Sequence, residues 1–153
     1  MKVLIRLVLI CLGIYIFLLV NNEWITITNH EFESDRVPTA FDGFKITQVT
    51  DLHDAEFGEN HKRLIKKVKA TNPDAIFITG DVIDSRRYNL EQSLRAVEQF
   101  TAIAPVYYVL GNHEVATNEP TVIYDALRRL GVRVLANESI LLEREGEKIA
   151  IAG

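Results

Sequence analysis

Residues with the chemistry of metal ligands follow three apolar segments of this 153-residue chain. They stand in three short runs, Asp51-Leu52-His53, Gly80-Asp81 and Gly111-Asn112-His113-Glu114. Carboxylate oxygens, imidazole nitrogens and the amide oxygen of asparagine bind divalent cations, and a carboxylate with its two oxygens can bridge two of them. The residue types therefore predict a metal site, provided that the fold brings the three runs together.

The spacing within each run has a geometric reason. Because successive side chains of an extended chain point to opposite faces, we expect Asp51 and His53 on one side and Leu52 in the core. A glycine directly precedes Asp81, and another precedes Asn112. Glycine lets the backbone turn sharply, so both ligands can approach the first two. The amide of Asn112 adds an oxygen ligand without adding charge.

Apolar runs of strand length alternate with segments of helical period along the chain, which is typical of an α/β domain with a largely parallel sheet. The expected strands are 24–28 at an edge, then 45–50, 75–79, 106–110 and 132–135, with a hairpin formed by 139–143 and 148–152. The expected helices are 60–70, 90–104 and 121–130. Since the carboxyl ends of parallel strands meet at one edge of a sheet, the three runs are expected to converge there.

Each run alone is common in loops, but the three together, in this order and each after a predicted strand, are specific. In this they resemble the calcineurin-like metallophosphoesterase superfamily, whose blocks run Asp-x-His, Gly-Asp and Gly-Asn-His-Glu. The resemblance extends from about Phe41 to Gly153 and looks like that of membrane-anchored or exported bacterial members. It implies the amino-terminal half of a layered α/β/β/α sandwich. It also implies hydrolysis of phosphate mono- or diesters by a hydroxide bound to two metal ions.

The resemblance implies a role for each site residue. Asp51 and His53 would bind the first metal ion, and Asp81 would bridge both ions. Asn112 would bind the second ion. His113 would be the catalytic residue, contacting the scissile phosphate or protonating the leaving group. The implied cofactors are two divalent ions of Mn, Fe or Zn.

One more carboxylate and two more histidines need an assignment. Asp84, three residues after Asp81, either holds a metal ligand in orientation or caps a turn. His30 and His61 match no ligand position of the superfamily, and we expect both at the surface.

The later ligands of the superfamily, a histidine after a further strand and a Gly-His-x-His block, have no match up to Gly153. We therefore expect the domain at 23–153 to be the amino-terminal part of a phosphoesterase, incomplete at its carboxyl end and inactive or weak alone. The alternative is a non-enzymatic product, a degenerate or truncated member that serves as a membrane-anchored interaction module.

The amino terminus has the composition of a membrane segment. Leu7 to Val20 carries no charge, and Lys2 and Arg6 precede it. A cleaved signal peptide is the competing interpretation, but no small-x-small cleavage site follows. We predict a signal anchor or transmembrane segment at 1–22, single-pass in the cell membrane, with the amino terminus cytoplasmic and the domain extracytoplasmic.

Charge and cysteine content exclude other classes. With 17 basic and 21 acidic residues the net charge is −4, and without Lys2 and Arg6 the remainder carries −6, so no nucleic-acid partner is expected. The single cysteine, Cys11, excludes an intramolecular disulfide and a cysteine-based zinc site. The basic stretch between Lys62 and Lys69 predicts a solvated helix covering the sheet, with an anionic lipid or envelope polymer as a second possibility.

Overall fold

A four-stranded parallel sheet forms the centre of the domain. The structure, a computed structural model, describes residues 2–22 and 24–153, the side chains of 19–22 excepted. The strands lie in the order of the chain, namely β1 (Ile46–Val49), β2 (Ala75–Ile78), β3 (Val106–Tyr108) and β4 (Arg133–Val134). Because every strand runs the same way, the carboxyl ends of β1, β2 and β3 share one edge, as the sequence predicts.

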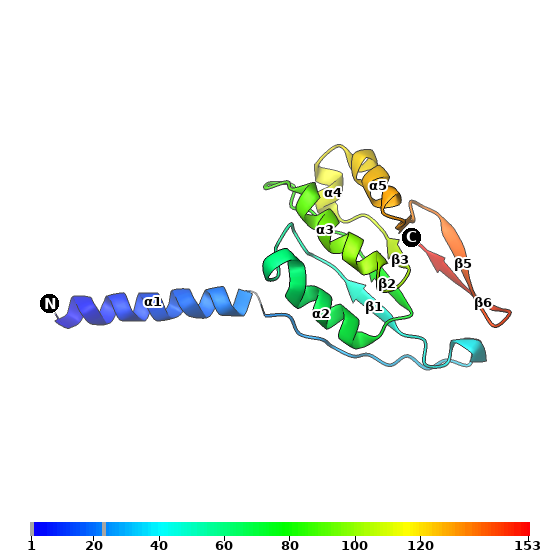
Figure 1. Ribbon diagram of the computed structural model, residues 1–153, viewed down its shortest axis with the longest axis horizontal. Coiled ribbons are helices and arrows are strands. Elements are labelled where there is room, and N and C mark those ends of the chain that lie inside the picture. The colour runs from blue at the N-terminus through cyan, green and yellow to red at the C-terminus, as the bar shows by residue number, and fades with distance from the viewer. Residues whose placement is uncertain (1, 23) are drawn as a thin grey trace.

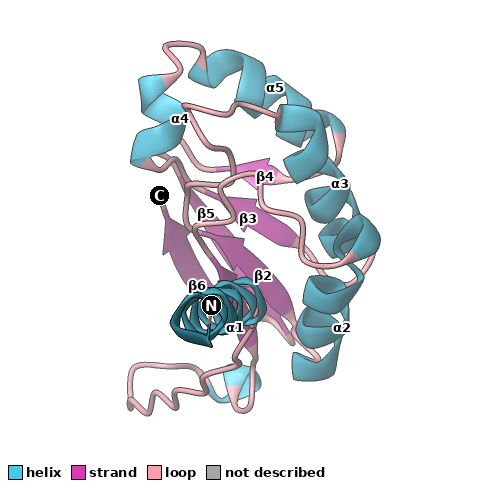
Figure 2. Ribbon diagram, turned by 90° about the vertical axis from the view of Figure 1, so that its left-hand side faces the viewer, coloured by secondary structure: helices cyan, strands magenta, loops and turns pink. Residues whose placement is uncertain are grey.

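Three amphipathic helices cover one face of this sheet (Figure 2). They are α2 (Lys62–Thr71), α3 (Leu90–Thr101) and α5 (Pro120–Arg129). Each contributes one apolar stripe to the core, and the opposite side of each helix is polar. The start of α3 is fixed by Asn89, whose side-chain oxygen accepts the Gln92 N–H at 3.3 Å, and Pro120 begins α5 where no backbone N–H is needed.

The other face of the sheet carries a second, smaller layer. A hairpin of β5 (Ser139–Arg144) and β6 (Glu147–Ala152) lies on that side, away from the helices (Figure 2). On this face the rings of Phe77 and Tyr107 meet edge to face, with centroids 5.4 Å apart. The segment before β1 also reaches the hairpin, since the Ala40 N–H donates to Glu147 Oε2 at 2.7 Å.

Most of the predicted elements are confirmed, with the boundaries changed by a few residues. The α/β class and the parallel sheet are confirmed, as are the three helices and the hairpin. The strand predicted at 24–28 is wrong, because this segment is extended but pairs with no described strand and leaves Trp24 73% exposed. A short helix, α4 (Asn112–Ala116), was not predicted. Two single 3-10 turns, η1 (Thr39–Phe41) and η2 (Glu59–His61), complete the elements.

The amino-terminal segment forms one long helix, α1 (Lys2–Asn22), which projects from the domain (Figure 1). Its large apolar side chains are mostly exposed, Val3 by 71% and Phe17 by 65%. Among the residues that the structure describes, no helix is long and apolar enough to cross a membrane. A helix is thus confirmed in this segment, and a membrane span is not.

The burial of side chains in the helix-covered core predicts which substitutions destabilise the domain. Leu127 of α5 is fully buried, whereas Val122 on the same helix is 49% exposed. Leu127→Ala removes buried methyl groups and leaves a cavity, so we expect a loss of about 2–5 kcal/mol in the free energy of unfolding. Val122→Ala, the control, should change it by less than about 0.5 kcal/mol. Urea denaturation followed by circular dichroism measures both, and equal losses would show that this face of α5 is not the core.

Candidate metal centre

Three of the predicted ligands lie together at the carboxyl edge of the sheet. Asp51, His53 and Asp81 each offer one ligand atom, and these atoms all lie within 4.8 Å of one another. The His53 Nε2 is 3.4 Å from the Asp51 Oδ1. One imidazole and two carboxylates around a common point suit a divalent cation such as Mn, Fe or Zn. Asp51 is exposed and the other two are half-buried, so an ion could enter from solvent.

The backbone at Asp51 and His53 is not the extended strand that the sequence predicts. β1 ends at Val49, and both Asp51 and His53 lie in the left-handed region, with φ of 56° and 48°. Asp81 shares that conformation, with φ of 52°. The expected reason for the proximity of Asp51 and His53 is therefore wrong, although the proximity itself and the burial of Leu52 are found. The chain turns twice within a few residues instead of continuing as a strand.

Hydrogen bonds between neighbouring loops hold these unusual conformations. The Asp51 N–H donates to the Gly80 carbonyl at 3.3 Å, and the His53 N–H donates to the Asp81 carbonyl at 3.0 Å. The loop after β1 thus continues the pairing with the loop after β2 beyond the strands. Non-glycine residues with positive φ carry conformational strain, which persists only where surrounding contacts support it. Here the supporting contacts come from the loop that carries the third ligand.

The Glu114 carboxylate connects the loop after β2 to the loop after β3 through hydrogen bonds. Its carboxylate is fully buried, and its Oε2 accepts the N–H groups of Asp81 at 2.9 Å and Gly111 at 2.8 Å. Its Oε1 accepts the N–H groups of Val82 at 2.7 Å and Ile83 at 3.4 Å. A buried carboxylate is tolerated when it accepts several such bonds, and charged acceptors make strong ones. The sequence placed Glu114 in the third run but did not reveal this role.

The two glycines of these runs are needed because the loops touch. A Cβ at Gly80 would lie 2.5 Å from the backbone of Gly111, and a Cβ at Gly111 would collide with the backbone and the carboxylate of Asp81. Gly80 also has φ of +96°, a conformation that other residues rarely adopt. Each glycine therefore permits the close approach that brings Asp81 to the ligand cluster.

His113 stands next to the cluster, and its partners determine the tautomer of its neutral ring. Its backbone N–H donates to Asp81 Oδ1 at 2.8 Å, and its ring lies 4.4 Å from that of His53, between centroids. Its Nδ1 accepts the Ser85 N–H at 3.1 Å. Because a backbone N–H can only donate, Nδ1 carries no proton, and the neutral ring has its proton on Nε2.

Asn112 is the one predicted metal ligand that is not part of the cluster of Asp51, His53 and Asp81. It is exposed and begins α4, between Gly111 and His113, whose backbones both approach Asp81. Its position along the chain places it at the correct edge of the sheet. Its role as a ligand of a second metal ion stays a prediction.

Asp84 is buried beside His113 and acts on the surrounding loop. Its Oδ1 accepts the Arg86 N–H at 2.9 Å and lies 3.7 Å from the His113 Nδ1, while its Oδ2 accepts from Arg87 Nε at 2.8 Å. The Arg86 N–H and then the Arg87 guanidinium hold the pKa of Asp84 at about 2. Asp84 thus caps a turn, as one of the two alternatives from the sequence has it, and its role in orienting a metal ligand stays a prediction.

Asp54 is a supporting residue that the sequence did not single out. Its Oδ2 accepts the N–H groups of Asp84 at 2.8 Å and Asn89 at 2.9 Å, and its Oδ1 accepts the Ser93 hydroxyl at 2.7 Å. It therefore links the loop after β1 to the loop before α3. The only signal in the sequence was its place directly after His53.

The other two histidines lie away from this cluster. His30 is exposed, as expected. His61 is only 1% exposed, so its predicted surface position is wrong. Its left-handed backbone at the start of α2 turns the ring inward, where Nε2 donates to the Gln92 carbonyl of α3 at 3.1 Å. A histidine that ties two helices together is structural.

The Glu114 contacts predict a large effect of a small substitution. Glu114→Gln replaces one acceptor oxygen by an NH2 group that faces backbone donors, so we expect the free energy of unfolding to fall by about 1–3 kcal/mol. Mn²⁺ affinity should fall as well, because Asp81 loses its backbone support. Glu119→Gln, on the exposed residue before α5, is the control. Calorimetric titration and urea denaturation measure the two effects, and unchanged values in Glu114→Gln would contradict the role of the carboxylate.

The low pKa of Asp84 predicts a pH dependence of stability. A carboxyl whose pKa is lowered from 3.8 to about 2 by folding stabilises the folded state fully above pH 3.8 and loses this contribution as the pH falls through about 2. The stability difference between the wild type and Asp84→Asn should therefore shrink over that interval. Urea denaturation at a series of pH values, with a chelator present, measures it. A difference that stays constant down to pH 2 would contradict the assignment.

Comparison with known proteins agrees with this geometry. Residues 44–148 match the family of calcineurin-like phosphoesterases. The metallophosphoesterase Cj0846 of Campylobacter jejuni is 27% identical over 148 residues, which cover 92% of this chain and 38% of that protein. The metallophosphoesterase YkuE of Bacillus subtilis is 31% identical over 130 residues, which cover 82% of this chain and 46% of that protein.

A third relative, from Bos taurus, is named a transmembrane protein with a metallophosphoesterase domain. It is 27% identical over 122 residues, which cover 78% of this chain and 28% of that protein. The chain thus spans less than half the length of each of these relatives. The match to the family covers more than half of the chain and includes all three runs of site residues. The chain therefore belongs to the calcineurin-like phosphoesterase family.

Proposed function

We propose that this chain carries the first part of a metal-dependent phosphoesterase site, which hydrolyses phosphate mono- or diesters. The observation that carries the proposal is the gathering of Asp51, His53 and Asp81 within 4.8 Å, next to His113, whose Nδ1 accepts the Ser85 N–H. Two carboxylates and one imidazole favour a hard or borderline divalent cation. An imidazole with its proton on Nε2 beside such an ion can donate a hydrogen bond to a phosphate or leaving-group oxygen, where charge develops.

The cluster of Asp51, His53 and Asp81 fits the first of the two divalent ions, of Mn, Fe or Zn, that the family implies. Asp51 and His53 would hold the first ion, Asp81 would hold both and Asn112 would hold the second. When bound, the ions would lower the pKa of water and neutralise phosphate oxygens during in-line displacement. These four residues supply fewer ligands than two ions of near-octahedral geometry need, so water or further protein groups would complete the shells.

His113 would be the catalytic residue that contacts the scissile phosphate. Its Nδ1 accepts the Ser85 N–H, so the proton of the neutral ring is on Nε2, which would donate a hydrogen bond to a phosphate or leaving-group oxygen and stabilise the charge that develops there. Asp84 would act on His113 through the turn that carries Ser85, because its Oδ1 accepts the Arg86 N–H at 2.9 Å, next to the Ser85 N–H that donates to Nδ1. Asp84 would thus orient His113 without touching the substrate.

The architecture fits the amino-terminal part of the four-layer α/β/β/α sandwich that the family implies. Helices α2, α3 and α5, the parallel sheet and the β5–β6 hairpin would be the first three layers. The relatives are each more than twice as long as the part matched here, so substrate and activity of the whole protein are included in this proposal.

We further propose that α1 anchors the domain at 23–153 in the cell membrane. The support is the exposed apolar surface of α1 and the name of the transmembrane relative. With Lys2 and Arg6 at its start, the positive-inside rule favours a cytoplasmic amino terminus and an extracytoplasmic domain.

The role of each residue is tested by separating metal binding from turnover. Asp81→Asn should reduce bound Mn²⁺ to the background level, since Asp81 would hold both ions. His113→Ala should keep the metal and slow hydrolysis of bis(p-nitrophenyl) phosphate by roughly 10²–10³-fold, the cost of losing one hydrogen-bond donor to the developing charge. Elemental analysis measures the bound metal, and a colorimetric assay measures the rate of hydrolysis. Both are made on this chain, and also on a longer form of the protein if this chain alone shows no hydrolysis.

His30→Ala is the matched histidine control, because His30 is exposed and far from the three runs along the sequence. Equal loss of metal in Asp81→Asn and His113→Ala would contradict the assigned roles. A wild-type protein that binds no Mn²⁺, Fe²⁺ or Zn²⁺ would favour the non-enzymatic alternative.

A further inference from the structure

Helix α2 concentrates positive charge on an acidic chain. Its ten residues include five basic side chains and no acidic one, whereas the chain as a whole carries −4. Lys62, Lys66 and Lys69 are spaced by four and three residues, so they share one face of the helix. Among the described residues, Lys62 pairs with Glu59 at 2.8 Å, and Lys66 and Lys69 form no ion pair. We refer to these three lysines as the basic face of α2.

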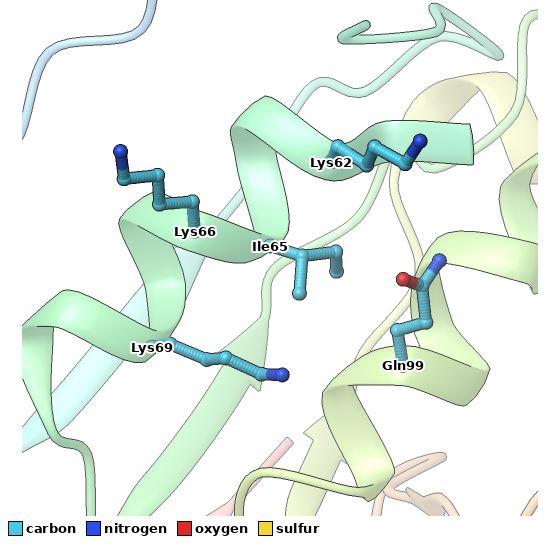
Figure 3. Close-up of a pocket in the computed structure, with 5 residues that line it drawn as sticks. All are labelled: Lys62, Ile65, Lys66, Lys69 and Gln99. Atoms are coloured by element: carbon cyan, nitrogen blue, oxygen red, sulfur yellow. The ribbon is translucent and has the colours of Figure 1, made fainter. Parts of the chain in front are cut away.

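The basic face borders a groove between α2 and α3. The groove has a volume of about 350 Å³ and is lined by the three lysines together with Ile65 and Gln99. Ile65 lies between the lysines, and Lys69 extends across the groove toward α3 (Figure 3). The Lys66 side chain points away from Ile65 (Figure 3). The Lys69 ammonium, which extends past the aliphatic side chain of Ile65, suits an amphiphilic anion, which has a charged phosphate next to hydrocarbon.

The basic face also lies near the point where α1 joins the domain. Among the three helices that cover the sheet, α2 is the one nearest α1 in both views (Figures 1 and 2). Ile25, shortly after α1, packs against the core cluster to which Leu64 and Val68 of α2 belong. The segment that follows α1 is thus packed against the same core that holds α2.

We propose that the basic face of α2 and its groove bind the headgroups of anionic phospholipids at the membrane into which α1 inserts. This inference rests on the membrane anchor of the proposed function. One apolar segment plus a basic patch is a combination that holds a protein at a bilayer more firmly than either alone. The placement next to α1 favours a lipid surface over a soluble polyanion, which would need no neighbouring apolar helix.

The test uses the full chain and lipid vesicles of two compositions, phosphatidylcholine alone and an equimolar mixture with phosphatidylglycerol. Each lysine near an anionic surface should contribute about fivefold in binding, so wild type should bind the mixed vesicles up to about 100-fold more tightly at about 0.1 M salt. This preference should disappear at about 1 M salt, where charges are screened.

The variant Lys62→Gln/Lys66→Gln/Lys69→Gln should lose the preference for mixed vesicles and keep its binding to phosphatidylcholine. The matched control Lys45→Gln/Arg129→Gln/Lys148→Gln removes the same charge from other parts of the surface and should keep the preference. Circular dichroism verifies that both variants fold. Retention of the preference in the first variant, or its equal loss in the control, would overturn the proposal.

The remaining outcomes separate this inference from the anchor. Binding to phosphatidylcholine without any gain from phosphatidylglycerol would overturn the lipid contact of α2 and leave the anchor standing. A lysine-dependent preference without binding to phosphatidylcholine would support the contact of α2 and contradict the anchor. If long-chain polyphosphate binds through the same lysines while mixed vesicles give no gain, the partner is a soluble polyanion and the lipid proposal is wrong.

Discussion

A single buried carboxylate, that of Glu114, determines the distance between two of the loops that form the candidate metal centre. It accepts four backbone N–H groups, three from the loop after β2 and one from the loop after β3. The N–H groups compensate the loss of hydration, which is the condition for a charge in the interior. The position of Asp81 therefore depends on a residue that does not bind a metal ion itself.

The remaining ligands depend on the same loops. Asp51 and His53 keep left-handed conformations because their N–H groups are bound to carbonyls of Gly80 and Asp81. A change in the Asp81 loop would therefore be transmitted to all three ligands. Gly80 and Gly111 make this coupling possible, since any side chain there would separate the loops. The site is one connected unit of three loops on a rigid parallel sheet, which suits a function that needs fixed ligand positions.

Most of the fold was predictable, because its strands and helices have strong local patterns. The apolar runs 75–79 and 106–110 gave β2 and β3, and the periodic segments gave α2, α3 and α5. The segment 24–28 has the residue alternation of a strand, and we predicted one there. A strand forms only where a neighbouring strand is available for pairing, and the sequence of the segment itself does not show whether one is. Likewise α4 is too short to show a helical period, and Glu114, with its backbone contacts, lies in its first turn.

The residue types of the site were predictable, but the contacts that shape it were not. Residue types and strand ends led to Asp51, His53 and Asp81. The positive φ angles of these residues are held by hydrogen bonds between loops far apart in sequence. The prediction that Asp51 and His53 lie close together is therefore correct, but strand alternation is not the reason. His61 shows the same limit, because the left-handed turn that buries it is not visible in a basic, helix-forming segment.

The most direct test of this account is anomalous diffraction from crystals of the protein grown with Mn²⁺. We expect a Mn²⁺ peak at the carboxyl edge of the parallel sheet, about 2.0–2.3 Å from one ligand atom of each of Asp51, His53 and Asp81. A Mn²⁺ peak bound elsewhere, or a map in which these three side chains point to separate regions of solvent, would contradict it.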